Sequence, residues 1–113
     1  MNEPYVPDVG DLVWLDFDPR AGHEQSSRRP AIVLTTRDYN EAASLAVVCP
    51  VTRQVTGYPF EVVLPPGSGF EGAILADHVK SIDWRVRRAE YKGRAAASVV
   101  DDLRERLRAL LCL

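Results

Sequence analysis

The sequence predicts a mainly β protein, built as a small antiparallel β-barrel with one C-terminal amphipathic helix. Three observations support this prediction. The first two-thirds of the chain contains several short apolar runs rich in strand-forming residues. Pro- and Gly-rich stretches separate these runs, which is typical of small barrels rather than of alternating β-α units. The last sixteen residues change to a helical period.

Six strands are predicted. The first is apolar on both faces at its centre, which indicates a strand buried on both sides, and we expect Trp14 to lie in the core. The main separators, residues 56–59 and 65–69, contain the Pro and Gly residues that favour turns. The predicted strands are Asp11–Phe17, Ala31–Thr35, Leu45–Val51, Phe60–Leu64, one strand that includes Gly72–Ala76 and Val79–Ile82, and one around Arg85–Arg94.

The C-terminal segment predicts a helix that begins at Ser98. Ser98 can act as the N-cap, with Asp101 three residues later as a short form of the capping box. Asp102 and Arg106 form an i,i+4 pair on the polar face. The apolar face is expected to pack on the barrel, and contact with a partner is the alternative. The apolar positions are Val99, Val100, Leu103, Leu107, Leu110 and Leu111.

The length and composition of the chain indicate which broad class of protein it belongs to. With 113 residues, of which 46% are hydrophobic, we expect one domain over residues 1–113. No apolar run reaches the roughly 20 residues of a membrane helix, and the N-terminus does not resemble a signal peptide. We therefore expect a cytoplasmic protein without membrane contact. Cys49 and Cys112 lack metal-ligand spacing, so we expect no metal site and no cofactor.

The net charge of −2 argues against a strongly basic nucleic-acid binder, but the charge is unevenly distributed. The segment Lys80–Arg94 contains six basic residues and only two acidic ones. Most of the basic residues in the chain are arginines, whose planar guanidinium suits two-pronged contact with phosphate. A local basic patch can bind nucleic acid on a mildly acidic protein. An exposed surface of salt bridges explains the same residues equally well.

The loop Gly22–Pro30 lies between two predicted strands and is rich in reactive groups. It includes Glu24, and Arg29 immediately before Pro30, a position that favours extended backbone at a strand entrance. Thr52 follows the run Leu45–Val51 and is expected at a strand end. If these strands are neighbours, Arg29 and Thr52 converge at one edge of the barrel. A polar hairpin turn with solvated charges is the alternative for this loop.

The motifs of this chain resemble the MazF/PemK/Kid family of toxin endoribonucleases from bacterial toxin–antitoxin pairs. The most specific match is Gly22-His23-Glu24-Gln25 followed by Arg28-Arg29-Pro30-Ala31, which corresponds to the family's G-x-E-Q…R-P signature. The resemblance extends over essentially the whole chain. The other matching blocks are Pro7–Trp14, Cys49–Thr52, Gly57–Val62 and Ala76–Asp83.

The resemblance implies an SH3-like barrel that forms a homodimer. It also implies metal-independent, sequence-specific cleavage of single-stranded RNA through attack by the 2′-hydroxyl, which leaves a 2′,3′-cyclic phosphate and a 5′-hydroxyl. Arg29 and Thr52 match the family's catalytic pair, and Glu24 matches its proposed acid–base carboxylate. A cognate antitoxin of the MazE type is expected to block the RNA groove with an acidic C-terminal segment.

The chemistry of the residues limits these roles. A guanidinium is a poor base, so we assign Arg29 mainly to transition-state stabilisation, with protonation of the leaving group as a further role. Thr52 would hold a non-bridging phosphate oxygen. Glu24 is the candidate base, or the group that orients Arg29. The candidate RNA contacts are Gln25, Arg28, Arg53, Gln54, Tyr58, Arg85 and Arg87.

Two other functions fit a small barrel. A CcdB-like toxin poisons DNA gyrase without catalysis, but that class depends on a C-terminal Trp-Gly-Ile, whereas this chain ends in Leu110-Leu111-Cys112-Leu113. A non-catalytic SH3-like adaptor would need an aromatic peptide groove, and aromatic residues are only 8% of the chain. The sequence therefore favours the ribonuclease.

Overall fold

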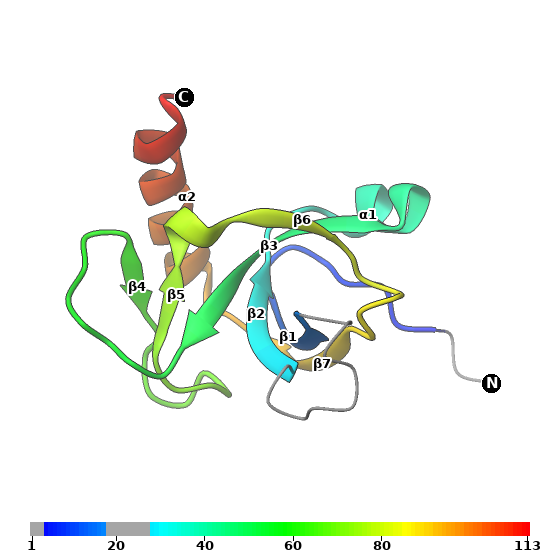
Figure 1. Ribbon diagram of the computed structural model, residues 1–113, viewed down its shortest axis with the longest axis horizontal. Coiled ribbons are helices and arrows are strands. Elements are labelled where there is room, and N and C mark those ends of the chain that lie inside the picture. Colours follow the sequence, from blue (N-terminus) through cyan, green and yellow to red (C-terminus); the bar gives the residue numbers. More distant parts are fainter. Residues whose placement is uncertain (1–3, 18–27) are drawn as a thin grey trace.

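A computed structural model describes residues 4–17 and 28–113 of the protein (Figure 1). Among these residues it contains a curved antiparallel sheet, a short helix and a longer C-terminal helix. The elements are β1 (Asp11–Asp16), β2 (Arg28–Val33), α1 (Arg37–Ala43), β3 (Leu45–Thr52), β4 (Glu61–Val63), β5 (Ala73–Leu75), the 3-10 helix η3 (Ala76–His78), β6 (Lys80–Asp83), β7 (Glu90–Arg94) and α2 (Ala97–Leu111).

The sheet has seven strands in the order β4-β5-β3-β2-β1-β7, with β6 also paired to β3. All of the pairings are antiparallel. The long strand β3 connects the two halves: Leu45 to Val48 pair with β6, and Val51 and Thr52 pair with β5. The predicted fold class is confirmed, although β4 and β7 remain the two ends of an open path.

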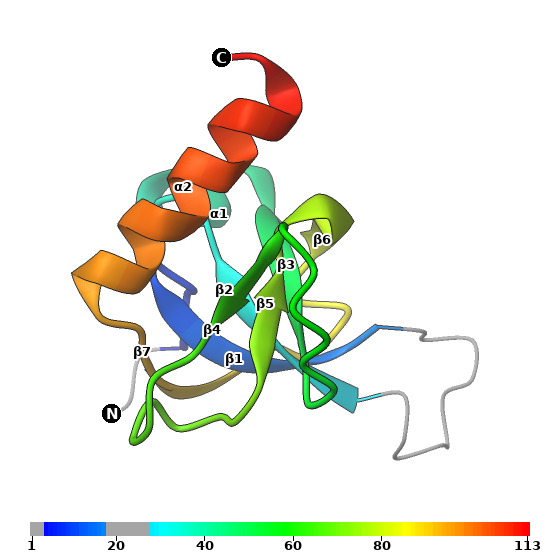
Figure 2. The same ribbon diagram turned by 90° about the vertical axis from the view of Figure 1, so that its left-hand side faces the viewer.

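The sheet buries apolar side chains on both faces, as predicted for its first strand. Because side chains alternate along a strand, Leu12 and Val13 belong to different core clusters. The cluster with Leu12 includes Val99, Val100 and Leu103 of α2, so the C-terminal helix covers that face (Figure 2). The cluster with Val13 includes Val6, Ile82 and Trp84. The predicted packing of the helix on the sheet is confirmed.

The helix α1 was not predicted from the sequence. It has only seven residues, and its one buried side chain is polar. That residue, Asn40, donates from Nδ2 to the backbone oxygens of Pro7 and Thr35, and its own backbone oxygen accepts from Trp84 Nε1 at 2.9 Å. The contacts with Pro7 and Trp84 come from distant parts of the chain, so no local pattern reveals them.

Two other predictions about secondary structure are wrong in detail. The helix α2 begins at Ala97 with Ala96 in the N-cap position, so Ser98 is not the cap. The predicted strand Arg85–Arg94 is a strand only from Glu90, because Asp83 accepts hydrogen bonds from the backbone N–H groups of Arg85 and Val86 and starts a turn. The predicted Asp102–Arg106 pair is present at 3.4 Å.

The two cysteines differ sharply in environment. Cys49 is fully buried, and burial raises the pKa of its thiol to about 12. Cys112 is exposed just beyond α2. Within residues 4–17 and 28–113, neither helix has the length and apolar character needed to cross a bilayer.

Candidate active site

Arg29 and Thr52 lie across from each other where β2 begins and β3 ends. The two strands are antiparallel, with Ala31 paired to Pro50. Extending this register by two residues places Arg29 opposite Thr52, on the same side of the sheet. Both residues line one open groove with a volume of about 520 Å³. The predicted convergence of this pair is therefore confirmed.

Thr52 is held in place from two directions. Its Oγ1 accepts a hydrogen bond from the backbone N–H of Gln54 at 3.2 Å, and the hydroxyl retains its own proton to donate. On the other side, a Cβ atom at Gly72 would stand only 1.9 Å from the carbonyl oxygen of Thr52. Gly72 also has φ of 120°, a conformation that favours glycine. This close backbone contact fixes the end of β3.

The groove is cationic and partly aromatic. It is suited to an anionic chain, because guanidinium and ammonium groups attract phosphate. Lys92 enters from β7, and the segment after β4 supplies Phe70 and Glu71. The side chains that give the groove its character are the cations Arg28, Arg29, Arg53 and Lys92, the carboxylate Glu71 and the rings of Trp14 and Phe70.

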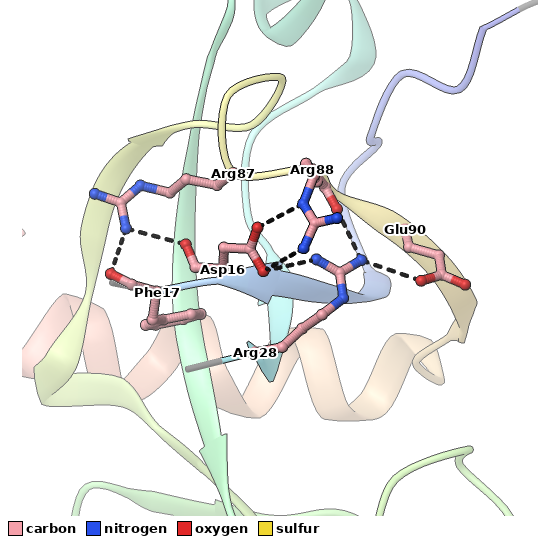
Figure 3. Close-up of polar contacts among 6 residues, drawn as sticks. All are labelled: Asp16, Phe17, Arg28, Arg87, Arg88 and Glu90. Carbon is pink, nitrogen blue, oxygen red and sulfur yellow. Dashed lines mark hydrogen bonds and ion pairs between the residues drawn. The ribbon is translucent and has the colours of Figure 1, made fainter. Parts of the chain in front are cut away.

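A charge network joins the end of β1 to the start of β2 (Figure 3). Asp16 accepts hydrogen bonds from Arg88 Nε at 2.7 Å and from Arg28 Nη1 at 3.0 Å. Arg28 also contacts Glu90 at 3.1 Å. Arg88, and then Arg28, hold the pKa of the Asp16 carboxyl below its usual value. The guanidinium of Arg28, a predicted RNA contact, is therefore already engaged in ion pairs at the rim of the groove.

Arg85 and Arg87, two other predicted RNA contacts, lie away from the groove lining. Arg87 donates to the backbone oxygens of Asp16 and Phe17 and so supports the end of β1 (Figure 3). Arg85 donates to the Ser44 hydroxyl and stacks over Trp84, with its guanidinium carbon 4.5 Å from the ring centroid. It lines a second depression instead. The structure does not bring these two arginines together with Arg29.

The remaining predicted contacts fall into three groups. Arg53 lines the groove, and Gln54 follows it on the exposed segment after β3. Tyr58 is half-exposed outside the groove lining, and the neighbouring Asp77 carboxylate raises the pKa of its hydroxyl. Glu24 and Gln25 lie outside the residues that the structure describes.

Sequence reasoning missed Lys92, Glu71 and Phe70 as groove residues and placed Trp14 in the core. Trp14 is only partly buried. It shares a strand face with Leu12, but α2 covers that face at Leu12, and Trp14 instead packs against Phe70 with the ring centroids 5.2 Å apart.

A curved antiparallel sheet with a cationic groove, in which a hydroxyl faces a guanidinium, is typical of a protein that binds a phosphate-bearing chain. Comparison with known proteins agrees with this class. The model of the family described as PemK-like, MazF-like toxins of type II toxin-antitoxin systems matches residues 8–111. The chain belongs to this family.

Two relatives match over almost their whole length. The chain is 47% identical to the endoribonuclease toxin MazF of Escherichia coli (strain K12) over 111 residues, which cover 98% of this chain and 99% of the relative. The crystal structure of MazF from Deinococcus radiodurans matches with a TM-score of 0.89 and 53% identity, over 97% of this chain and all of that one.

A crystal structure of a MazE–MazF complex from the same organism matches with a TM-score of 0.88 and 47% identity, over 97% of this chain and 99% of that chain. These matches confirm the family predicted from the sequence. They also confirm the enzyme class that this family implies, an endoribonuclease toxin.

Proposed function

We propose that this toxin cleaves single-stranded RNA at short sequence motifs without a metal ion. The ribose 2′-hydroxyl attacks the adjacent phosphorus, the bond to the 5′-oxygen breaks, and the products carry a 2′,3′-cyclic phosphate and a 5′-hydroxyl. The observation that carries the proposal is the placement of Arg29 opposite Thr52 in a cationic groove. Cleavage of messenger RNA by this route would inhibit translation and growth.

The two placed groups suit the charge that develops in this reaction. As the 2′-oxygen adds to phosphorus, negative charge builds on the non-bridging oxygens, and preorganised donors stabilise it. Arg29 offers a permanently charged guanidinium, and Thr52 offers a hydroxyl proton from a fixed position. Neither is a good base at neutral pH. We therefore retain Glu24 for the base, or for the group that orients Arg29.

We also propose two partners. The first is a second copy of the chain, as a homodimer. The second is a cognate antitoxin of the MazE type, for which the MazE–MazF complexes of Deinococcus radiodurans are the precedent. An acidic antitoxin segment would compete with RNA for Arg53 and Lys92, which are exposed cations in the groove. A cytoplasmic location, where messenger RNA is available, belongs to the same proposal.

The test is incubation of the purified protein with a long single-stranded RNA in excess EDTA, followed by mapping of every cut and its end groups. We expect cuts at a recurring short motif with cyclic phosphate and 5′-hydroxyl ends. Loss of the cuts in EDTA, or 5′-phosphate ends, would contradict the mechanism. Intact RNA together with inhibition of DNA gyrase supercoiling would favour the CcdB-like alternative.

A further inference from the structure

We propose that Phe70 and Trp14 form a subsite for one nucleobase of the RNA, on the wall of the groove that contains Arg29. The inference rests on the proposed ribonuclease function and adds to it the residues that hold a base near the reacting phosphate. It concerns side chains to which the sequence analysis assigned no contact with RNA.

The geometry of the two rings leaves aromatic surface available. Their centroids are 5.2 Å apart and their planes are at 84°, so the edge of one ring meets the face of the other. In such a T-shaped pair, the ring that contributes its edge keeps both of its faces free of its partner. Both rings are only partly buried, and both line the groove. A planar apolar surface therefore borders solvent inside a cationic groove.

The segment that carries Phe70 runs between β7 and the end of β3. A Cβ atom at Gly93 would lie 3.7 Å from the Ser68 carbonyl oxygen, an ordinary van der Waals distance, so the start of this segment lies alongside β7. Two residues after Phe70, Gly72 packs against the backbone of Thr52. The ring is therefore presented from a fixed backbone that is shared with the candidate catalytic threonine, which lowers the entropic cost of binding.

The surroundings of the rings favour a base rather than another ligand. Single-stranded RNA is usually bound by a cationic groove that follows the backbone and by aromatic side chains on which splayed bases stack. Arg53 and Lys92 are exposed cations on the same groove. They would also attract an acidic peptide, but the ring faces stack far better on a nucleobase than on a carboxylate.

The rings and Arg29 offer two different places in the groove, one for a base and one for a phosphate. Trp14 pairs in register with Pro30, the residue after Arg29. Because successive side chains of β2 point to opposite sides, the ring wall and the Arg29 side chain lie on opposite sides of the strand where it begins. Both still line the groove, so the groove takes in both sides of the sheet at this strand end. A base on the rings and a phosphate at Arg29 are thus distinct positions of one bound strand.

The experiment uses a short RNA with one mapped cleavage site and a set of copies with an abasic ribose at each position in turn. Stacking contributes about 1–3 kcal/mol per base. At tenfold per 1.4 kcal/mol, Phe70→Leu should lower kcat/KM by about 5- to 140-fold. One abasic position should cost the unsubstituted protein a similar factor and should cost Phe70→Leu almost nothing more. Phe70→Trp should retain most of the activity, and Tyr39→Leu, on exposed α1, should be unaffected.

Three results would overturn the inference. Abasic losses that add fully to the Phe70→Leu loss at every position would show that no base lies on this ring. Unchanged cleavage by Phe70→Leu, with weaker binding of an acidic peptide, would show that Phe70 and Trp14 contact a protein partner instead of a base. An abasic scan of the unsubstituted protein in which no position matters would exclude a base subsite, whether or not the variant folds. Absence of any cleavage by the unsubstituted protein would instead refute the proposed function, and this inference with it.

Discussion

Replacement of Gly72 by alanine tests how strictly the position of Thr52 controls cleavage. The new Cβ atom would lie 1.9 Å from the Thr52 carbonyl oxygen, whereas real Cβ contacts are essentially never closer than 3.0 Å. The backbones at Thr52 and Gly72 must therefore move apart by about 1.1 Å, the difference between these two distances. A misplacement of about 1 Å at a catalytic group can lower a rate by about 100-fold. We expect a loss of this size in kcat/KM for Gly72→Ala.

The matched control is Gly67→Ala in the same connecting segment. Gly67 also has a positive φ, 85°, but an added Cβ atom there would meet nothing within 4 Å. Both variants should lose stability, by about 1–3 kcal/mol, because alanine is strained at positive φ. Urea unfolding measures that shared cost, and RNA cleavage at a temperature where both proteins are folded measures the difference. Gly67→Ala should cleave at close to the original rate.

The double variant with Thr52→Val identifies the route of the effect. If Gly72→Ala acts by displacing Thr52, it should cost much less when the Thr52 hydroxyl is already absent. A folded Gly72→Ala protein with unimpaired cleavage would refute the argument that this contact positions the threonine. If the losses from Gly72→Ala and Thr52→Val add fully, Gly72→Ala acts on another part of the groove.

Four further outcomes are expected. Arg29→Ala should lower cleavage by about 100- to 1,000-fold without changing the circular dichroism spectrum, because an exposed donor to the transition state is lost. Glu24→Gln should reduce the rate and flatten the acid limb of its pH profile, and a larger loss for Glu71→Gln would transfer the role of base to that carboxylate. Asp16 has a lowered pKa, so its stabilising effect exists above the ordinary carboxyl pKa and is lost as the pH falls through the lowered value; thermal melts of Asp16→Asn should therefore differ from the original at pH 7 and converge with it in acid. Leu103→Ala should cost about 2–5 kcal/mol in urea unfolding, since this side chain of α2 is fully buried against the sheet.

The sequence predicted those parts of the fold that have a local cause. Apolar runs and turn residues located β1 and β3 closely, and helical spacing located α2. The start of α2 was misplaced by two residues, because Ser98 is a good N-cap by type while the observed N-cap is Ala96. The helix α1 has no such local cause, since Asn40 is fixed by Pro7, Thr35 and Trp84.

The candidate site was predictable to the same extent. Arg29 and Thr52 could be paired because both adjoin apolar strands and the strands are neighbours. Lys92 and Phe70 could not be assigned, because they reach the groove through β7 and the segment before β5, whose packing depends on the whole sheet. The arginines between Arg85 and Arg88 looked like an RNA-binding patch by charge alone. Their hydrogen bonds to Ser44, Asp16 and Phe17 show that they largely hold the protein together.

The contrast between the two cysteines makes this chain suitable for attaching a probe at one defined point. A maleimide reacts with a thiolate, and the buried Cys49, with its pKa raised to about 12, presents almost none at neutral pH. Cys112 is exposed at the end of α2, on the opposite side of the molecule from the start of β2 (Figures 1 and 2). A fluorophore or surface linker would thus attach at Cys112 without any substitution and leave the groove facing solution. Binding of RNA or of an antitoxin peptide could then be followed on single immobilised molecules.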